Sequence, residues 1–561
     1  MTSLIKKRKD GRDYYYAVRS ARVDGKPRIV WQKYLGPVEQ VIRKLENGTP
    51  EPPEYSLSFE FGGPAALLAV AESIDLKGII DKHVPKRDQG PSVGDYLLLC
   101  ILNRVLGPTS KSKLSEWYEG TILQRLWKYP PDCFTAQHFW NHMDRIGPEQ
   151  IKAIETEIAG RVIAEYKVNL DCVLYDATNF FTYIGSGNSR NTLAQRGHSK
   201  ERRADLRIVG LGLVVTRAFK IPLLHQTYAG NVSDSAQFPS ICVALAERMR
   251  ELSKRCEDLT LVFDKGNNSA DALVLGQIEH LHFVGSLSPS DHPELLDIPL
   301  EEFQQASEER WPGVRAYRTS VTAMGQEWPC VITFSEHFHS QQLQGWVAQR
   351  TKATAQLEEL NREISKQGNR RKRKSIESRV QEILAPLPFR KTFSVNVVER
   401  DGGRFSLSYT SDLEAFHRFV SRRGGKTILF TDHQDWTNEE VIAAYRGQSE
   451  IESAFRLMKC DEYLHWQPMF HWTDSKIQVH AFYCVLALLL VSLLTKRLHE
   501  AGLNLPPEKI LDLVSKMDET VIFYPERNGK QTTETTYTKP KPVQKKIMDV
   551  LHLNRWQVSQ G

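Results

Sequence analysis

Apolar residues along this chain follow two different spacings, and the spacing changes several times. The N-terminal stretch holds two short aromatic and β-branched runs, DYYYAVRS and PRIVWQKYL, with the turn DGKP between them. Runs of this kind around a turn predict a small β unit with a linker, residues 1–56. Residues 57–168 then show apolar positions three or four apart, as in VGDYLLLCILNRVL. This spacing predicts a helical region.

The pattern changes again at residue 169. DCVLYDATNFFTYIG, ADLRIVGLGLVVTR and IPLLHQTYAG are typical of three consecutive strands. A helix follows, with Phe238, Ile241 and Leu245 on one face, and then the buried strand LTLVFDKG. Residues 169–288 are therefore predicted to form a mixed α/β sheet with a right-handed crossover.

Residues 289–424 interrupt this pattern. Two strand-like stretches, SVTAMGQEWPCVITF and KTFSVNVVERDGGRFSLSYT, flank a long polar helical segment. Within 350–379 there are 10 Lys and Arg against 4 Asp and Glu, a difference of +6, and no continuous apolar stripe is evident. Two interpretations stay open: a solvated helix face, or contacts to a phosphate backbone that give affinity without base specificity.

The α/β pattern resumes over residues 425–500. The strand GKTILFTDHQ precedes a capped helix that we expect to run from Thr437 to about Lys459. The apolar run Ala481 to Leu494 is fourteen residues long, against about 20 for a membrane span, so it predicts a buried core helix and no membrane partner. Residues 501–561 are expected to be a polar tail and a candidate for dimerisation.

Composition narrows the class of protein. With 41% apolar and 25% charged residues, disorder of the whole chain is excluded. The net charge of +6 is small for this length, so any polyanion must be bound by local basic patches. The eight cysteines are scattered without a CxxC pair, which disfavours a zinc knuckle or a disulfide framework. Together with an N-terminus that lacks a signal peptide, this predicts a cytoplasmic protein.

Two carboxylates end predicted strands. Asp176 follows Val173-Leu174-Tyr175, and Asp264 follows the run LVF. If these strands are neighbours, the carboxylates lie about 4.8 Å apart, and a divalent cation would relieve their repulsion. Two hard cations held by such oxygens form a clamp for attack on a phosphodiester. Taken singly, either Asp is better explained as a cap or turn at a strand end.

A third carboxylate, Glu452, lies on the helix predicted from Thr437 to about Lys459. Tyr445, Glu452 and Lys459 are seven residues apart and share one stripe, with Gln448 and Arg456 in the same sector. An ordinary amphipathic surface helix with internal ion pairs explains the spacing by itself. The two strand-end Asp residues favour the functional interpretation.

These motifs, taken in order, resemble the DDE transposases of bacterial insertion sequences, in the insertion-sequence 4 superfamily with its YREK signature. Tyr445, Glu452 and Lys459 stand at the spacings of that signature, and Gln448 replaces its Arg. YDATNFF and VFDKGNNS resemble the first and second acidic motifs, and RGHSKERRADLRIVGLGLVV and YAGNVSDS resemble further segments of the family core. The resemblance covers roughly residues 170–290 and 425–495.

The resemblance implies a fold and a chemistry. The fold would be a ribonuclease H-like core, a mixed five-stranded sheet with helices, interrupted by a β-rich insertion and preceded by the small β unit and a helical DNA-binding region. A plain helical bundle explains residues 57–168 equally well. The triad Asp176, Asp264 and Glu452 would bind two Mg²⁺, for which Mn²⁺ could substitute. The partners would be double-stranded transposon ends and target DNA, held by a homodimer, with cleavage through a hairpin.

The resemblance and the charge pattern together give a set of DNA-contact candidates. They are Tyr445, Arg446, Gln448, Arg456, Lys459, Arg196, His198, Lys200, Arg202, Arg203, Arg370, Arg371, Lys372, Arg373 and Lys374.

Two other functions remain in view. One is a structure-selective or repair nuclease on the same core, which would need neither synapsis nor strand transfer. The other is a domesticated relative that binds DNA without cutting it, which an intact acidic triad disfavours.

Overall fold

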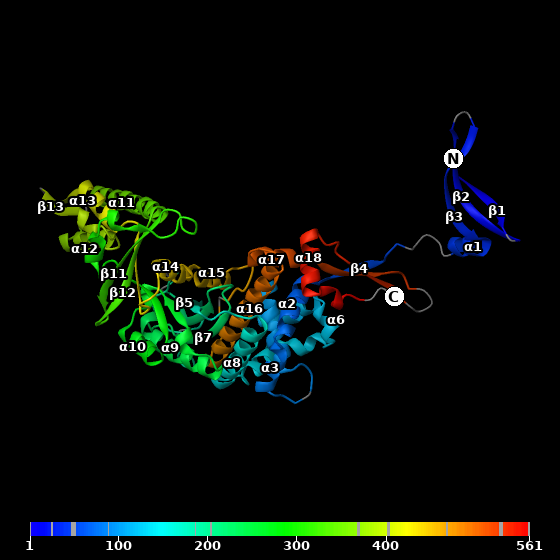
Figure 1. The fold of residues 1–561 in the computed structure, drawn as a ribbon, viewed down its shortest axis with the longest axis horizontal. Helices are drawn as coiled ribbons and strands as arrows, with labels where there is room; N and C mark the ends of the chain where they lie inside the picture. Colours follow the sequence, from blue (N-terminus) through cyan, green and yellow to red (C-terminus); the bar gives the residue numbers. More distant parts are fainter. Residues whose placement is uncertain are drawn as a thin grey trace.

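The structure is a computed structural model of a mixed α/β protein, built on one large sheet with helices on both faces (Figure 1). It describes residues 2–9, 11–23, 26–46, 52–87, 89–185, 187–201, 203, 205–366, 371–400, 404–466, 469–526 and 531–558.

The large sheet has nine strands in the order β10-β11-β12-β15-β9-β8-β5-β6-β7. Its bounds, in that order, are Gln304–Gln305, Val314–Ala323, Gln326–Ser335, Lys426–Thr431, His282–Leu287, Thr260–Phe263, Cys172–Thr182, Arg207–Thr216 and Pro222–Ala229. β5, β6 and β7 pair antiparallel, whereas β8 runs parallel to both β5 and β9.

The expectation of five strands is wrong, because four more extend the edge formed by β9. β15 pairs antiparallel with β9, and β12 and β11 continue outward from β15. An unpaired strand edge offers a row of backbone donors and acceptors, and here the strands of the insertion satisfy it. Part of the insertion is therefore continuous with the core sheet.

Both faces of the sheet are buried, and the two-residue repeat of a strand sorts β5 between them. Val173 and Tyr175 join the core under α9 (Asp234–Glu251) and α10 (Ala270–Ile278). Leu174 and Phe180 join the core that contains α16 (Asp474–Glu500). Odd-numbered and even-numbered residues of β5 therefore lie on opposite faces of the sheet.

Residues 57–168 are helical, as predicted, and pack around α16. The helices are α2 (Gly62–Ser73), α3 (Leu76–His83), α4 (Val93–Leu106), α5 (Leu114–Glu119), α6 (Leu123–Trp127), α7 (Ala136–Met143) and α8 (Pro148–Glu165). Among the described residues α16 is the one helix long and apolar enough to cross a membrane, yet 94% of its most apolar window is buried inside the protein. The apolar run Ala481 to Leu494 is thus a core helix, which confirms the prediction.

The region after α16 is ordered, which corrects the expectation of a polar tail over 501–561. It contains α17 (Pro507–Val514), β16 (Asp518–Phe523), β17 (Thr533–Tyr537) and α18 (Pro542–Leu551). β16 pairs with β17 and with β4 (Tyr55–Glu60), so the two ends of the main body close on one small sheet. Apolar residues at helical spacing along α17 and α18 enter the core beside α2.

Residues 2–46 form a small β unit, as predicted, with one more strand than expected. β1 (Thr2–Lys9), β2 (Arg12–Val23) and β3 (Lys26–Pro37) make an antiparallel sheet, followed by α1 (Val38–Glu46). β1 carries the sequence TSLIKKRK, whose polar character hid it from pattern analysis.

The long polar segment of the insertion is a pair of helices with its own small core. α11 (Glu336–Ile364) and α12 (Arg373–Leu384) pack with the hairpin β13 (Phe393–Arg400) and β14 (Arg404–Ser411) and with α13 (Leu413–Arg423). α11 buries Trp346, Ala353, Leu357, Leu360 and Ile364, a stripe at helical spacing. The prediction that this segment lacks an apolar stripe is wrong.

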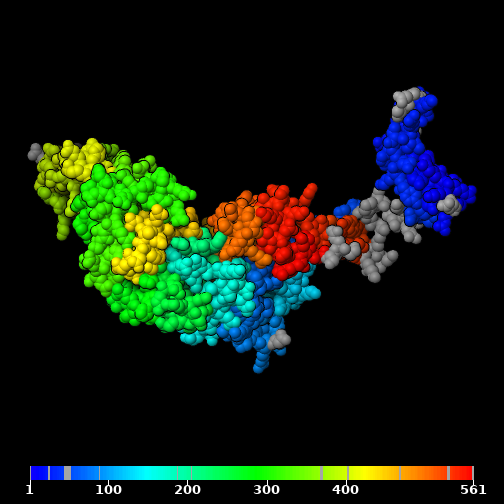
Figure 2. All heavy atoms as spheres, viewed as in Figure 1, coloured from blue at the N-terminus to red at the C-terminus, as the bar shows by residue number. Residues whose placement is uncertain are grey.

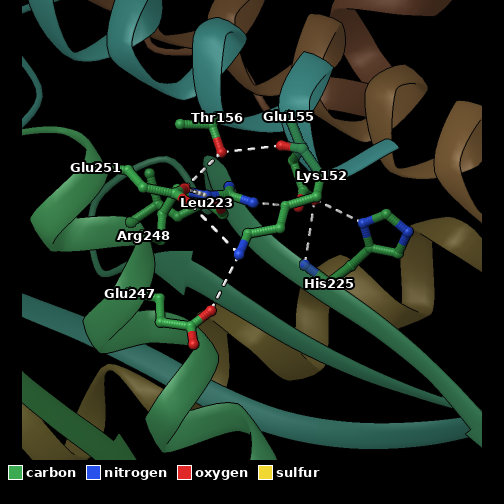
Figure 3. Close-up of polar contacts among 8 residues, drawn as sticks. All are labelled: Lys152, Glu155, Thr156, Leu223, His225, Glu247, Arg248 and Glu251. Atoms are coloured by element: carbon green, nitrogen blue, oxygen red, sulfur yellow. Dashed lines mark hydrogen bonds and ion pairs between the residues drawn. The ribbon is translucent and has the colours of Figure 1, made fainter. Parts of the chain in front are cut away.

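A buried charge cluster fastens the helical region to the sheet (Figure 3). Glu155 on α8 lies 2.6 Å from His225 Nδ1 on β7 and 2.8 Å from Arg248 Nη2 on α9. Arg248 also donates to the carbonyl oxygen of Leu223 at 2.6 Å. Burial raises the pKa of Glu155, but His225 and Arg248 outweigh it and hold the pKa below its usual value. The carboxylate is thus held ionised at the junction of three elements.

Candidate active site

Asp176 and Asp264 lie at the same edge of the sheet. β5 and β8 run parallel, and Leu174 is paired with Val262. Each Asp is two residues beyond that pair, so the carboxylates keep the same register and point to the same face. Neighbouring strands are about 4.8 Å apart, so one cation could bridge both side chains.

Asp264 is held by two hydroxyl groups. Ser286 Oγ on β9 donates to Asp264 Oδ1 at 2.8 Å, and the Tyr445 hydroxyl on α14 (Asn438–Arg446) lies 2.9 Å from the same oxygen. Burial raises the pKa of Asp264, but these hydrogen bonds outweigh it, and the pKa is lower than usual. Asp264 is therefore an ionised, fixed oxygen donor.

Asp176 is in a different electrostatic state. Burial raises the pKa of Asp176 to about 6, and the carboxylates of Asp234 and Asp264 act in the same direction against the nearby Lys200 ammonium. The backbone amide of Ala177 donates to Asp176 Oδ1 at 2.8 Å. Because burial disfavours the charged form, a cation bound at Asp176 would lower this pKa again.

Glu452 comes from the helix that covers this edge. The predicted single helix is divided at Gly447 into α14 and α15 (Gln448–Met458). Gln448 is buried and donates through Nε2 to the carbonyl oxygen of Tyr175 at 3.2 Å, directly before Asp176. Glu452 is one turn further on the same face of α15 and is exposed. Asp264 and Glu452 both contribute to raising the pKa of Tyr445, after burial, so Tyr445 lies near both carboxylates.

Asp176 and Asp264 therefore end neighbouring strands, and Glu452 lies on the helix that packs against β5. Among the described residues, the one group of three His, Cys, Asp or Glu side chains with ligand atoms within 4.8 Å of one another is His282, Asp432 and His433, so the three carboxylates are not this close together. Carboxylate oxygens are the ligands that Mg²⁺ and Mn²⁺ prefer, and the pKa of Asp176 is raised mainly by burial, with smaller contributions from the Asp234 and Asp264 carboxylates. The residues present fit a hard divalent cation.

The other signature residues lie around this edge in different environments. Lys459 pairs with Glu201 at 3.1 Å and lies over the Phe180 ring. Arg446 is exposed and stacks on Trp311, and Arg456 is exposed on α15. Gln448, with 8% of its surface exposed, fixes α15 to β5 instead of facing outward.

The basic loop after β5 is partly engaged with the site. Lys200 donates to the carbonyl oxygen of Ala177 and pairs with Asp234 at 3.3 Å, which places this cation beside Asp176. The His198 carbonyl accepts from Asn179, and Arg203 pairs with Asp205 at 2.9 Å. Arg196 lines a surface cavity with Tyr183 and Arg207. Arg202 lies outside the described residues.

The basic run 370–374 is not brought to the carboxylates. Its described residues run from Arg371 into the first turn of α12, where Arg371 pairs with Glu363 at 3.0 Å and Arg373 with Glu377 at 2.9 Å. Lys372 and Lys374 are exposed, and Arg370 lies outside the described residues.

Sequence reasoning missed Ser286 and the role of Asp234. Ser286 sits in the middle of β9, where nothing in the pattern distinguishes it from a structural serine. Asp234 begins α9, and Tyr228 donates to it at 2.7 Å. Tyr228 and Asp234 both lie in the segment YAGNVSDS, which resembles a segment of the family core. The sequence alone did not show that Asp234 lies near Asp176.

A cavity of about 490 Å³ opens beside Asp264 and Tyr445. Cationic side chains on its wall include Lys265, Arg423 and Arg446, and Asp264 is the one carboxylate among its described lining residues. The molecule is also hollowed on this side, between the insertion helices and α17, where Figure 1 places α14 and α15 (Figure 2). A polyanion could approach the carboxylates from here.

A second group of metal-type ligands lies at the opposite ends of the same strands. His282, Asp432 and His433 place ligand atoms within 4.8 Å of one another. Asp432 accepts from the Phe283 amide and from His282 Nδ1, both at 2.8 Å, and His433 bonds to Thr260 at 2.9 Å. Since these bonds join β8, β9 and β15, the group has a structural role without a cation.

Comparison with known proteins gives little. No family model matches the chain, and no curated protein matches it. Among solved structures, a piggyBac transposase synaptic complex with hairpin DNA has a TM-score of 0.34 at 8% identity, covering 80% of this chain and 79% of that chain. A TM-score of this size does not establish a shared fold, and the function proposed below rests on the geometry of the carboxylates.

Proposed function

We propose that this protein is a divalent-metal-dependent DDE transposase that cuts and joins DNA. The observation that carries the proposal is the convergence of Asp176 and Asp264, in register on adjacent parallel strands, with Glu452 on a helix fixed to one of them. The central strand order β9-β8-β5-β6-β7, with the first three parallel and the last two antiparallel, supports a ribonuclease H-like core.

In this proposal Asp176, Asp264 and Glu452 would hold two Mg²⁺, or Mn²⁺, and the bound ions would supply the Lewis-acid chemistry for attack of a water or a DNA 3′-OH on a phosphodiester. The chain's own groups then have defined tasks. Tyr445 and Ser286 keep Asp264 ionised and oriented, and Lys200 partly balances the charge of Asp176. Arg446, Arg456 and Lys459, around the same edge, would contact phosphates of the bound strand.

The partners would be double-stranded transposon ends and target DNA, bound by two copies of this chain that hold the two ends together. Cleavage through a hairpin belongs to the same proposal. A nuclease of this fold would cut the same bonds without joining them, so strand transfer is the activity that separates the two.

The test uses isosteric variants: Asp176→Asn, Asp264→Asn and Glu452→Gln. Each keeps side-chain shape but removes a metal-binding charge, so we expect cleavage of an end-containing duplex to fall by about a thousandfold or more, about 4 kcal/mol. Gel-shift affinity in EDTA should stay within about threefold of the parent, which separates catalysis from binding.

Glu450→Gln is the matched control, because Glu450 lies on the same helix and pairs with Lys220 at 3.4 Å instead of joining the carboxylates. It should cleave normally. Parental cleavage by any one of the three triad variants would remove that residue from the active site. Cleavage without joining would make the protein a nuclease.

A further inference from the structure

A second cavity of about 410 Å³ lies between the helical region and the segment that precedes α16. Its walls include Arg104 at the end of α4, the turn Pro108 to Ser112, Trp140 on α7, and His471. The turn supplies Lys111 and the hydroxyl side chains of Thr109, Ser110 and Ser112. It takes no part in the chemistry proposed above.

Two cations share this cavity without a counter-ion. Lys111 Nζ donates to the Tyr483 hydroxyl at 3.0 Å, and Arg104 donates to the carbonyl oxygen of His465 at 2.5 Å and approaches the Tyr483 hydroxyl at 3.5 Å. Among the described residues that line the cavity there is no Asp or Glu. Within the described chain, moreover, neither cation forms an ion pair with a carboxylate.

The neighbouring groups are neutral. His480 Nε2 lies 3.0 Å from the carbonyl oxygen of Trp466, which can only accept, so Nε2 carries the proton and Nδ1 accepts from Tyr483 at 2.6 Å. Burial lowers the pKa of His471 and His480 and raises that of Tyr483. Burial, and also the charge of Arg104, lowers the pKa of Lys111 to about 8.

Two cations side by side repel each other, and this costs free energy unless an anion joins them. The cavity is also lined by the hydroxyl groups of Thr109, Ser110 and Ser112. Thr109 Oγ1 donates to Asn103 Oδ1 at 3.3 Å, and the two serine hydroxyls bond to each other at 2.8 Å, so one serine hydroxyl hydrogen is left for a ligand. A hydroxyl group, a guanidinium and an ammonium together form the donor set that binds a phosphate group.

The position of the cavity favours a phosphate that belongs to DNA. Thr182, at the end of β5, forms a bridge to Met469 on the cavity wall. Asp176 is six residues back along the same strand, about 20 Å away at 3.3 Å for each residue. Exposed aromatic rings flank the entrance: Trp140 is 40% exposed, and Phe470 is 63% exposed and stacked on Tyr183. They suit the sugar and base that accompany a phosphate.

We infer that this cavity, centred on Lys111 and Arg104, binds a phosphate of a DNA strand that extends from the carboxylate site, and so fixes the path of the DNA across the helical region. The inference rests on the proposed function in taking DNA as the ligand. It is tested by binding alone, without a divalent cation, so it can fail while the proposed cleavage chemistry stands.

The test compares Lys111→Met with Lys113→Met, an exposed lysine at the other end of the same short turn. Affinity for a 30-base-pair duplex is measured by fluorescence anisotropy in EDTA at several salt concentrations. For Lys111→Met we expect about a tenfold loss of affinity and a decrease of about 0.9 in the log–log salt slope, the value for one phosphate contact. Lys113→Met should remain within twofold.

A thermal denaturation experiment provides the second readout. Lys111→Met removes an unbalanced charge from the free protein, so its Tm should be equal to or higher than that of the parent. Inorganic phosphate at constant ionic strength should raise the Tm of the parent and leave that of Lys111→Met unchanged. A lower Tm for Lys111→Met would make the lysine a structural residue and overturn the inference. Unchanged DNA affinity and slope would overturn it too, even if phosphate still raised the parental Tm, because the cavity would then hold a free anion only.

Discussion

At the scale of single residues, the two aspartates show how neighbouring carboxyl groups acquire different properties. Asp264 receives two hydroxyl groups on one oxygen, whereas Asp176 is buried beside other carboxylates. Their pKa values consequently move in opposite directions. Asp264 is therefore ionised across the neutral range, and Asp176 changes its ionisation near pH 6.

This difference predicts how stability depends on pH. The folded-state pKa of Asp176, about 6, is above the ordinary value of 3.8, so folding favours its protonated form. Stability without metal should therefore fall as pH rises from about 4 to 6, by up to about 3 kcal/mol at 1.36 kcal/mol for each pH unit. Asp176→Asn should abolish this loss, and its Tm at pH 7.5 in EDTA should exceed that of the parent.

Repeating the experiment with Mg²⁺ tests whether the loss of stability comes from the charge of Asp176 or from burial in general. Mg²⁺ should raise the Tm of the parent at pH 7.5 and have little effect on Asp176→Asn. Asp171→Asn, five residues earlier and exposed, is the control and should behave as the parent does. If Asp176→Asn were less stable than the parent in EDTA, the carboxylate would be balanced by its protein neighbours.

At the scale of elements, the position of Glu452 depends on how α15 meets β5. A Cβ added at Gly447 would lie 3.0 Å from the Ala444 carbonyl oxygen and 3.1 Å from Leu174 Cδ2, so a larger residue must push the helix away from the strand. Gly447→Val should cost about 1–3 kcal/mol of stability, as overpacking does. Cleavage should fall by more than binding, since Glu452 moves with α15.

Gly345→Ala is the matched control for this prediction. Gly345 also lies in a helix, but an added Cβ meets nothing within 4 Å, so Ala should be neutral or stabilise α11 by up to about 1 kcal/mol. Chemical denaturation measures both variants. Parental cleavage by Gly447→Val would show that the contact between α15 and β5 does not set the geometry of the carboxylates.

The basic turn between α11 and α12 gives a prediction about affinity. Two of its cations are already in ion pairs, whereas Lys372 and Lys374 are exposed. If each contacts one phosphate, the double variant Lys372→Gln/Lys374→Gln should reduce the salt slope of DNA binding by about 1.8 and weaken all sequences alike. Lys545→Gln/Lys546→Gln, on exposed positions of α18, should leave the slope unchanged. An unaltered slope in the first variant would make the turn a solvated surface.

At the scale of the whole molecule, the helical region and the sheet are joined by the buried cluster around Glu155 (Figure 3). Removing one partner of a buried ion pair leaves the other charges unbalanced. Glu155→Ala should therefore cost about 3–5 kcal/mol, measured by urea denaturation. Because the folded-state pKa of Glu155 is below 4.5, its contribution is present above that pH and is lost as the solution becomes more acidic.

Glu157→Ala, two residues later on α8, is the control. Glu157 pairs with Lys82 and His83 near the surface, where such a pair contributes about 0–1 kcal/mol. Similar losses for both variants would contradict the assignment of Glu155 as the joint between the two parts of the molecule.

Many of the helices and strands of this protein follow from the local amino-acid sequence and could be predicted from it. The alternation of strands and helices from residue 169, the buried apolar helix before residue 500, and the strand-end positions of Asp176 and Asp264 all follow from short-range spacing. Glu452 also falls on the predicted helix, although Gly447 divides that helix into two.

Tertiary structure alone decided which residues meet. The extension of the sheet beyond β9, the return of residues 501–558 to the core, and the contacts of Ser286 with Asp264 and of Lys111 with Tyr483 join segments from 22 to several hundred residues apart. Side-chain spacing reports the face of a strand or helix, but not the element packed against it. For that reason the sequence predicted the carboxylates and their order, while their charge states, their supporting hydroxyl groups and the second cationic cavity depended on long-range packing.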